Sequence, residues 1–139
     1  MSLIMVLSYY DGKDFFPNNT SHNCFVKLNR ALQFDGYWVV ALSEIGTSER
    51  AQKDELFVYS DICQDSFVGS SEQPLLRRIF YEDVNDKNII YVNPYYVPVN
   101  LKDIQQIHIY IKDENGNDAS FFKKKVTVAL HLKKIPFVS

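Results

Sequence analysis

The feature that most constrains the fold is an alternation of apolar and polar side chains with a period of two residues. Isoleucine occupies every second position in residues 107–112, and residues 125–133 repeat the pattern with valine and leucine. Successive side chains of a strand point to opposite faces, so each segment is expected to form a strand with one buried side. A shorter apolar run predicts a first strand at residues 3–8.

Two other segments are apolar on both faces. In residues 55–63, one predicted face carries Leu56, Val58 and Ile62, and the other carries Phe57, Tyr59 and Cys63. Residues 37–45 divide in the same way, with Trp38, Val40 and Leu42 opposite Tyr37, Val39, Ala41 and Ile45. Two interpretations stay open. Either these are central strands covered by loops, or one face meets a neighbouring molecule.

Turn residues separate the predicted strands. Asp35-Gly36 and Asn115-Gly116 are strong signals for a reversal of the chain, and Pro94 and Pro98 restrict their segment to strand edges and bends. About eight antiparallel strands in two facing sheets are expected, which predicts an all-β single jelly roll over residues 1–139. An immunoglobulin-like sandwich is disfavoured, because the order Cys, Trp, Cys on the required strands and the tyrosine corner are missing.

Length and composition limit the alternatives. A chain of 139 residues fits one domain that buries about 70% of its unfolded surface. Its 17 acidic and 15 basic residues argue against a dedicated nucleic-acid binder. The lone pair Cys24 and Cys63 predicts reduced thiols. No signal peptide or membrane span is expected, and the sequons at residues 18–21 are interpreted as a turn.

Catalytic motifs are not found in the sequence. It has no Gly-rich phosphate loop, no nucleophile elbow with Ser, His and Asp in order, and no Cys with a plausible base. The three histidines, His22, His108 and His131, do not lie at metal-ligand spacing. We therefore expect no catalysis, no cofactor and no metal.

Several blocks resemble the vertex (penton) proteins of Polinton or Maverick elements and adintovirus-like DNA viruses. The similar positions, in chain order, are residues 16–20, 25–28, Leu32, Phe34, Gly36, Trp38, Ala41, Leu42, Glu44, Ile45, 58–64, Val68, Gly69, 74–77, 96–99, 107–111, Asp113, Gly116, Phe121, Val128, Leu130 and His131. They extend over nearly the whole chain.

The resemblance implies a structural protein of an icosahedral capsid. Such a protein is a single jelly roll that forms homopentamers at the fivefold vertices, beside a major capsid protein built from a double jelly roll. The implied location is the virion, with synthesis in the cytoplasm and assembly in the host nucleus as one option. The alternative function is a jelly-roll binding module, either lectin-like or similar to a trimeric ligand. A jelly-roll enzyme is disfavoured further by the missing ligand cluster.

Six residues are candidates for the subunit interface or for family motifs: Trp38, Tyr59, Asp61, Gly69, Arg77 and Tyr96. Asp61 and Arg77 are considered as a pair across the bend that holds Gly69, with two solvated charges as the alternative. The basic residues Lys123, Lys124, Lys125, Lys133 and Lys134 would contact packaged DNA weakly if they face the particle interior. We expect them instead to protect an edge strand from aggregation.

Overall fold

The computed structural model describes residues 2–47, 55–80, 88–100, 102–118 and 126–136. Helical structure among these residues is limited to one short turn, η1 (Tyr9–Gly12). The strands are β1 (Ser2–Ser8), β2 (Asn23–Gln33), β3 (Trp38–Thr47), β4 (Glu55–Ser60), β5 (Ser66–Val68), β6 (Ser71–Gln73), β7 (Leu75–Phe80), β8 (Asn88–Ile90), β9 (Val97–Pro98), β10 (Asp103–Asp113) and β11 (Val126–Lys134).

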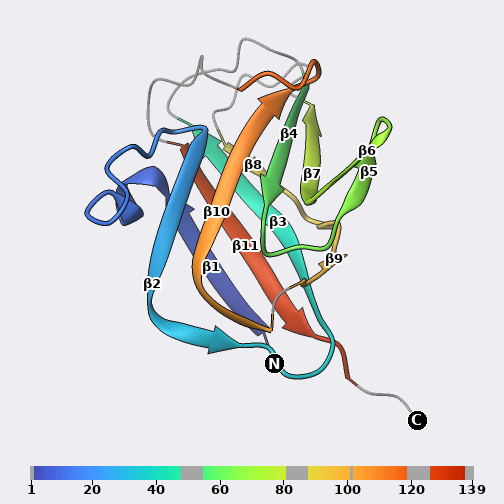
Figure 1. Cartoon of the computed structure of the whole chain (residues 1–139). Helices are drawn as coiled ribbons and strands as arrows, with labels where there is room; N and C mark the ends of the chain where they lie inside the picture. Colours follow the sequence, from blue (N-terminus) through green and yellow to red (C-terminus); the bar gives the residue numbers. More distant parts are fainter. Residues whose placement is uncertain (1, 48–54, 81–87, 101, 119–125, 137–139) are drawn as a thin grey trace.

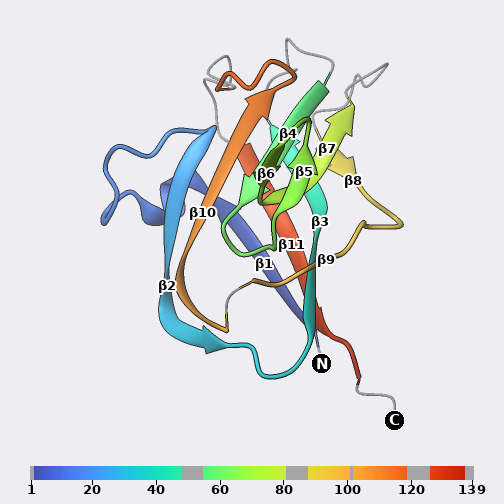
Figure 2. The same ribbon diagram turned by 45° about the vertical axis from the view of Figure 1, so that its right-hand side comes forward.

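The strands form two facing antiparallel sheets (Figure 1). Sheet A has the order β1-β11-β3-β8, and β9 pairs with a different part of β3. Sheet B has the order β2-β10-β4-β7. Strands β5 and β6 pair only with each other and form a hairpin inserted between β4 and β7. Figure 2 shows this hairpin coming forward when the right-hand side of the molecule is turned toward the viewer.

The order of the strands confirms the predicted jelly roll. If β8 and β9 count as one interrupted strand and the inserted hairpin is set aside, eight strands remain. Successive strands then lie in opposite sheets, except β4 and β7. Late strands separate early ones, since β11 lies between β1 and β3 while β10 lies between β2 and β4. This interleaving is the double-sheet jelly-roll arrangement.

The core lies between the sheets and uses the apolar face that the alternation predicted. Its largest fully buried side chains are Val40, Leu42, Ile45, Leu56, Val58, Ile62, Leu76, Ile79, Ile107, Ile111, Leu130 and Leu132. Each removes apolar area from water, which contributes about 1.5–3 kcal/mol per side chain. Both sheets supply these residues, so neither sheet can bury its apolar face without the other.

A β-bulge in β3 corrects one predicted orientation. Leu42 pairs with Leu130 and Glu44 pairs with Ala129, so Ser43 is an extra residue in β3. Its Oγ donates a hydrogen bond to the carbonyl of Ala129 at 3.0 Å. A bulge adds one residue and therefore reverses the alternation beyond it. Ile45 consequently lies in the core with Leu42 instead of on the opposite face with Ala41.

The two tight turns do not close the hairpins that their sequences suggest. Gly36 and Gly116 both adopt positive φ, which glycine tolerates without steric cost. The strands flanking Asp35-Gly36 nevertheless lie in different sheets, and so do β10 and β11, which precede and follow Asn115-Gly116. Turn chemistry fixes only the local reversal, whereas the apolar faces select the strand partners.

The predicted role of two C-terminal lysines as edge protection is wrong. Lys133 and Lys134 lie in β11, which pairs with β1 on one side and β3 on the other. The strand is therefore interior to sheet A and has no free edge to protect. Lys123, Lys124 and Lys125 lie outside the described residues.

Candidate functional site

Exposed apolar side chains gather on the two lateral sides of the sandwich, where the sheets end. We define the β1–β2 side as β1, β2 and the connecting segment 9–22. The β7–β9 side consists of β7, β8, β9, the segment 91–96 that connects β8 to β9, and the β5–β6 hairpin. Figure 1 shows the blue segment of the first side on the left, with the green hairpin and β7 on the right, and Figure 2 keeps the blue segment on the left.

The β7–β9 side is the more apolar of the two. Its exposed large side chains are Phe67, Phe80, Ile90, Val92 and Tyr95. Val92 is 89% exposed, a value that leaves almost none of its surface covered by its own chain. Clustered exposed apolar residues mark interaction surfaces more often than scattered ones do.

A cavity of about 490 Å³ opens on this side, along β7. Leu75, Leu76 and Val97 contribute apolar wall, and Phe80 and Tyr95 are exposed members of the lining. Among the described residues of its lining, the charged ones are Arg77 and Arg78, and none is a carboxylate. The cavity is therefore apolar with a positive wall.

Arg77 forms part of the link between the two sheets at this side. It pairs with Val58, whose side chain is in the core, so Arg77 projects from the inner face of the edge strand β7. Its guanidinium lies 3.6 Å from the centre of the Tyr91 ring. Its Nη1 atom is buried and has no hydrogen-bond partner among the described residues. The structure therefore contains a guanidinium with unused hydrogen-bonding capacity next to an apolar cavity.

The predicted pair of Asp61 and Arg77 does not form. Asp61 Oδ1 instead accepts a hydrogen bond from the backbone N–H of His108 at 3.0 Å, and the Asp61 N–H donates to the carbonyl of His108 at 3.3 Å. Asp61 thus extends the pairing of β4 with β10 beyond the end of β4. Burial raises the pKa of its carboxyl, and the hydrogen bond from His108 opposes part of that rise.

The β1–β2 side carries fewer apolar residues. Ile4 and Val6 project from the outer face of the edge strand β1 and are about two-thirds exposed. Phe15 is 63% exposed and lies on the segment between η1 and β2, with the ammonium of Lys27 4.5 Å from its ring centre. This side therefore presents a protruding aromatic residue, whereas the opposite side contains a cavity.

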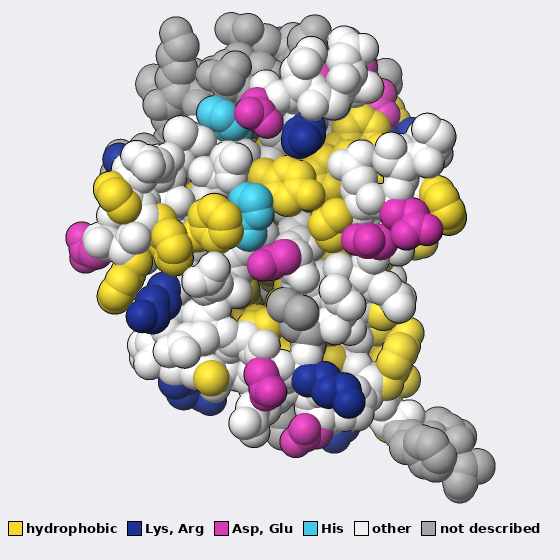
Figure 3. Space-filling model, in the orientation of Figure 1, with side chains coloured by type: hydrophobic (Ala, Val, Ile, Leu, Met, Phe, Trp, Pro, Cys, Tyr) yellow, Lys and Arg dark blue, Asp and Glu magenta, His cyan; other side chains and the backbone are white. Residues whose placement is uncertain are grey.

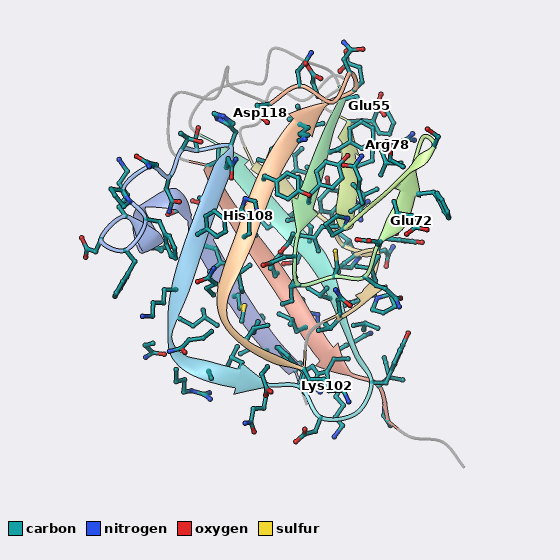
Figure 4. The ribbon with its side chains drawn as sticks, viewed as in Figure 1. Glu55, Glu72, Arg78, Lys102, His108 and Asp118 are labelled. Atoms are coloured by element: carbon teal, nitrogen blue, oxygen red, sulfur yellow. The ribbon has the colours of Figure 1, made fainter. Side chains whose placement is uncertain are left out.

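A row of aromatic rings crosses the outer face of sheet B. In order, the rings belong to Phe16, Phe25, His108, Tyr110, Tyr59 and Phe57. Successive ring centres are 4.1–6.5 Å apart. Figure 3 shows hydrophobic side chains on both sides of a central histidine, which Figure 4 labels as His108.

The geometry of this row limits what it can bind. Phe25 and His108 are stacked with their planes 7° apart, and Tyr59 and Tyr110 are 17° apart. Because the rings stack on one another, their faces are already occupied and their edges are what remains for a partner. Flat ligands such as nucleic-acid bases need free ring faces. The row is therefore better suited to stabilising the sheet through aromatic pairs.

The remaining candidate residues do not converge on one place. Tyr59 is 3% exposed, and it lines a groove of about 640 Å³ together with Gly69. Gly69 has φ +62° and lies in the turn of the β5–β6 hairpin. Trp38 is buried and its Nε1 donates to the Asp35 carbonyl at 3.0 Å. Tyr96 bonds His131 Nδ1 through its hydroxyl at 2.7 Å.

No family model matches this chain, and no curated protein sequence matches it significantly.

No helix among the described residues has the length and apolar character needed to cross a membrane. Within those residues, no three His, Cys, Asp or Glu side chains are grouped as metal ligands.

Sequence reasoning missed the residues that form these surfaces. Phe15, Phe67, Phe80, Val92 and Tyr95 were not among the candidates, although each of them except Phe80 is a large apolar residue beside a polar or turn-forming neighbour. That context was a usable signal, because a residue in such a segment is seldom needed for the core. Of the six candidates, only Arg77 lines the cavity on the β7–β9 side.

Both thiols are expected to resist alkylation in the folded protein. Cys24 and Cys63 are buried and unbridged, as predicted. Burial raises the pKa of Cys24 to about 11 and that of Cys63 to about 12, from 9.0 for an exposed thiol. The thiolate is the reactive form, so modification by iodoacetamide at pH 8 should require unfolding.

The same pKa shifts predict how stability depends on pH. The folded state favours the protonated thiols, so their contribution is complete below pH 9 and is lost as the pH rises toward 11–12. Denaturant titrations at pH 8 and pH 10.5 should show the decrease, with Cys24→Ala/Cys63→Ala as the control. Rapid alkylation of the native protein at pH 8 would contradict the predicted resistance of the two thiols to alkylation.

Proposed function

We propose that this protein is a capsid vertex subunit that assembles into a closed homopentamer. The observation that carries the proposal is the pair of lateral sides with exposed large apolar residues, Phe15 on one and Phe80, Val92 and Tyr95 on the other. The jelly roll supports it, because viral capsid proteins use this architecture, although lectins and cupins use it as well. The resemblance to penton proteins favours the capsid among these classes.

A ring needs an interface between two different patches of the same subunit. When the rotation that relates neighbours closes, such a heterologous contact produces a cyclic assembly, and when it does not close, it produces a filament. The two lateral sides of this sandwich supply two different patches. A single patch would support only a twofold dimer.

The proposal extends to partners and location. The outer surface of the ring would contact a major capsid protein with a double jelly roll, and the location would be the virion, after synthesis in the cytoplasm. Assembly in the host nucleus and weak contact of lysines with packaged DNA belong to the same proposal. Catalysis, a cofactor and a membrane partner are not part of it.

The mass of the purified protein tests the proposal. We expect native mass spectrometry to find a species of five times the 16.2 kDa subunit mass, and negative-stain images to show five-membered rings. The measurement should cover a concentration series, because association follows mass action. A trimer would support the alternative of a binding module. A protein that stays monomeric over the whole series would contradict the capsid proposal.

A further inference from the structure

We propose that the contact between ring neighbours is made by Asp14 and Phe15 of one copy, which enter the cavity along β7 in the next copy. This inference rests on the ring proposed above and specifies which surfaces meet in it. The occupant is therefore a second copy of this chain.

The segment that carries Phe15 is held in place by its own chain. The N–H groups of Phe15 and Phe16 both donate to the Gly12 carbonyl, at 3.1 and 2.7 Å, and the N–H of Asn19 donates to the Phe16 carbonyl at 3.1 Å. The Asn19 side chain in turn bonds both backbone groups of Phe25 in β2. Phe15 is thus presented by a structured turn. Preorganisation lowers the entropic cost of docking a side chain.

The cavity accommodates an aromatic side chain. Its volume of about 490 Å³ lies within the range of pockets that bind small molecules. Leu76 and Val97 are buried and supply apolar floor, and the exposed ring of Tyr95 is available to pack against an incoming ring. An aromatic residue that fills a pocket of a neighbour is a common source of binding energy in interfaces.

The charges of the two surfaces are complementary. Asp14 is exposed and precedes Phe15 directly, whereas the charged residues among the described part of the cavity wall are Arg77 and Arg78. Arg78 already contacts Glu55 at 3.4 Å, a pair that Figure 4 places near the upper ends of β4 and β7. Arg77 has a guanidinium nitrogen without a hydrogen-bond partner in the described part of the chain. A carboxylate brought in by a neighbour would therefore meet a positive wall.

The placement of the two surfaces favours closure of the ring. Segment 9–22 and the β5–β6 hairpin next to the cavity lie on opposite sides of the sandwich, at a similar level along its long direction in Figures 1 and 2. Patches at the same level allow a rotation without translation, which closes, whereas patches at different levels generate a helix.

Complementation between two variants tests this contact. Phe15→Ser removes the protruding ring and leaves the cavity intact, and Tyr95→Glu alters the cavity and leaves the ring intact. Both residues are more than 60% exposed, so neither change should affect folding of the subunit. Each variant alone should dissociate, with the contact weakened by at least about 30-fold. An equimolar mixture should form heterodimers and no rings, because each heterodimer has only one intact contact.

Tyr37→Ser is the matched control. Tyr37 is also exposed but lies outside both surfaces, so this variant should keep the wild-type rings. Thermal melts of all variants verify that the subunit remains folded. Wild-type protein without rings would overturn the proposed function. Rings that persist in Phe15→Ser would overturn only the contact inferred here, and so would a mixture that yields no heterodimer.

Discussion

Gly12→Ala is expected to destabilise the folded subunit by at least about 2 kcal/mol. A Cβ at this position would overlap the carbonyl oxygen of Phe25 and lie 3.0 Å from Asn19 Nδ2. The first contact is with backbone of β2, which cannot move without disturbing its pairing with β10. Overpacking of this kind costs about 1–3 kcal/mol, and loss of the adjacent hydrogen bonds adds to that cost.

The reason for this sensitivity lies in the free edge of β2. Asn19 Oδ1 accepts from the Phe25 N–H at 2.9 Å, and its Nδ2 donates to the Phe25 carbonyl at 2.7 Å. The side-chain amide of Asn19 therefore makes the hydrogen bonds to the free edge of β2 that a neighbouring strand would otherwise make. Asn19→Ala should cost about 1–3 kcal/mol, because both backbone groups lose their partner.

Guanidinium titrations monitored by circular dichroism would measure both effects. Gly69→Ala is the comparison, since an added Cβ there meets nothing within 4 Å and only the positive φ opposes it. It should cost about 1 kcal/mol. Equal stability of Gly12→Ala and the wild type would show that the segment before β2 packs differently.

Sequence reasoning predicted the fold because the alternation of side chains decides which face of a strand is buried. Ile107, Ile109 and Ile111 all lie in the core as predicted. The pattern does not specify which strands become neighbours, and Asn115-Gly116 wrongly suggested that β10 and β11 pair. Local turn chemistry carries no information on the long-range pairing of β10 with β2 and β4.

The candidate site was predicted less well than the fold. Asp61 directly follows β4 and Arg77 lies in the neighbouring strand β7, yet Asp61 bonds His108 and Arg77 stacks on Tyr91. Which partner a charged side chain meets depends on register and on which sheet face it occupies. A β-bulge or an inserted hairpin changes both the register and the sheet face that a side chain occupies. The exposure of residues such as Val92 depends on where the sheets end.

Ile45→Ala is expected to lower the free energy of unfolding by about 2–5 kcal/mol, the usual cost of truncating a buried isoleucine. Strict alternation along β3 would group Ile45 with the exposed Tyr37, but the bulge at Ser43 turns Ile45 into the core, where it is fully buried opposite Val128.

Tyr37→Ala is the comparison that distinguishes a β3 with the bulge at Ser43 from a β3 without it. Truncation of this exposed side chain should change stability by less than about 0.5 kcal/mol. Chemical denaturation at a single protein concentration below that of ring formation gives both values without a contribution from assembly. Similar stabilities of the two variants would mean that β3 continues without a bulge. In that case the sheet order would stand, but Ile45 would lie on the outer face of sheet A with Val39 and Ala41, and the core would lack one of its largest fully buried side chains.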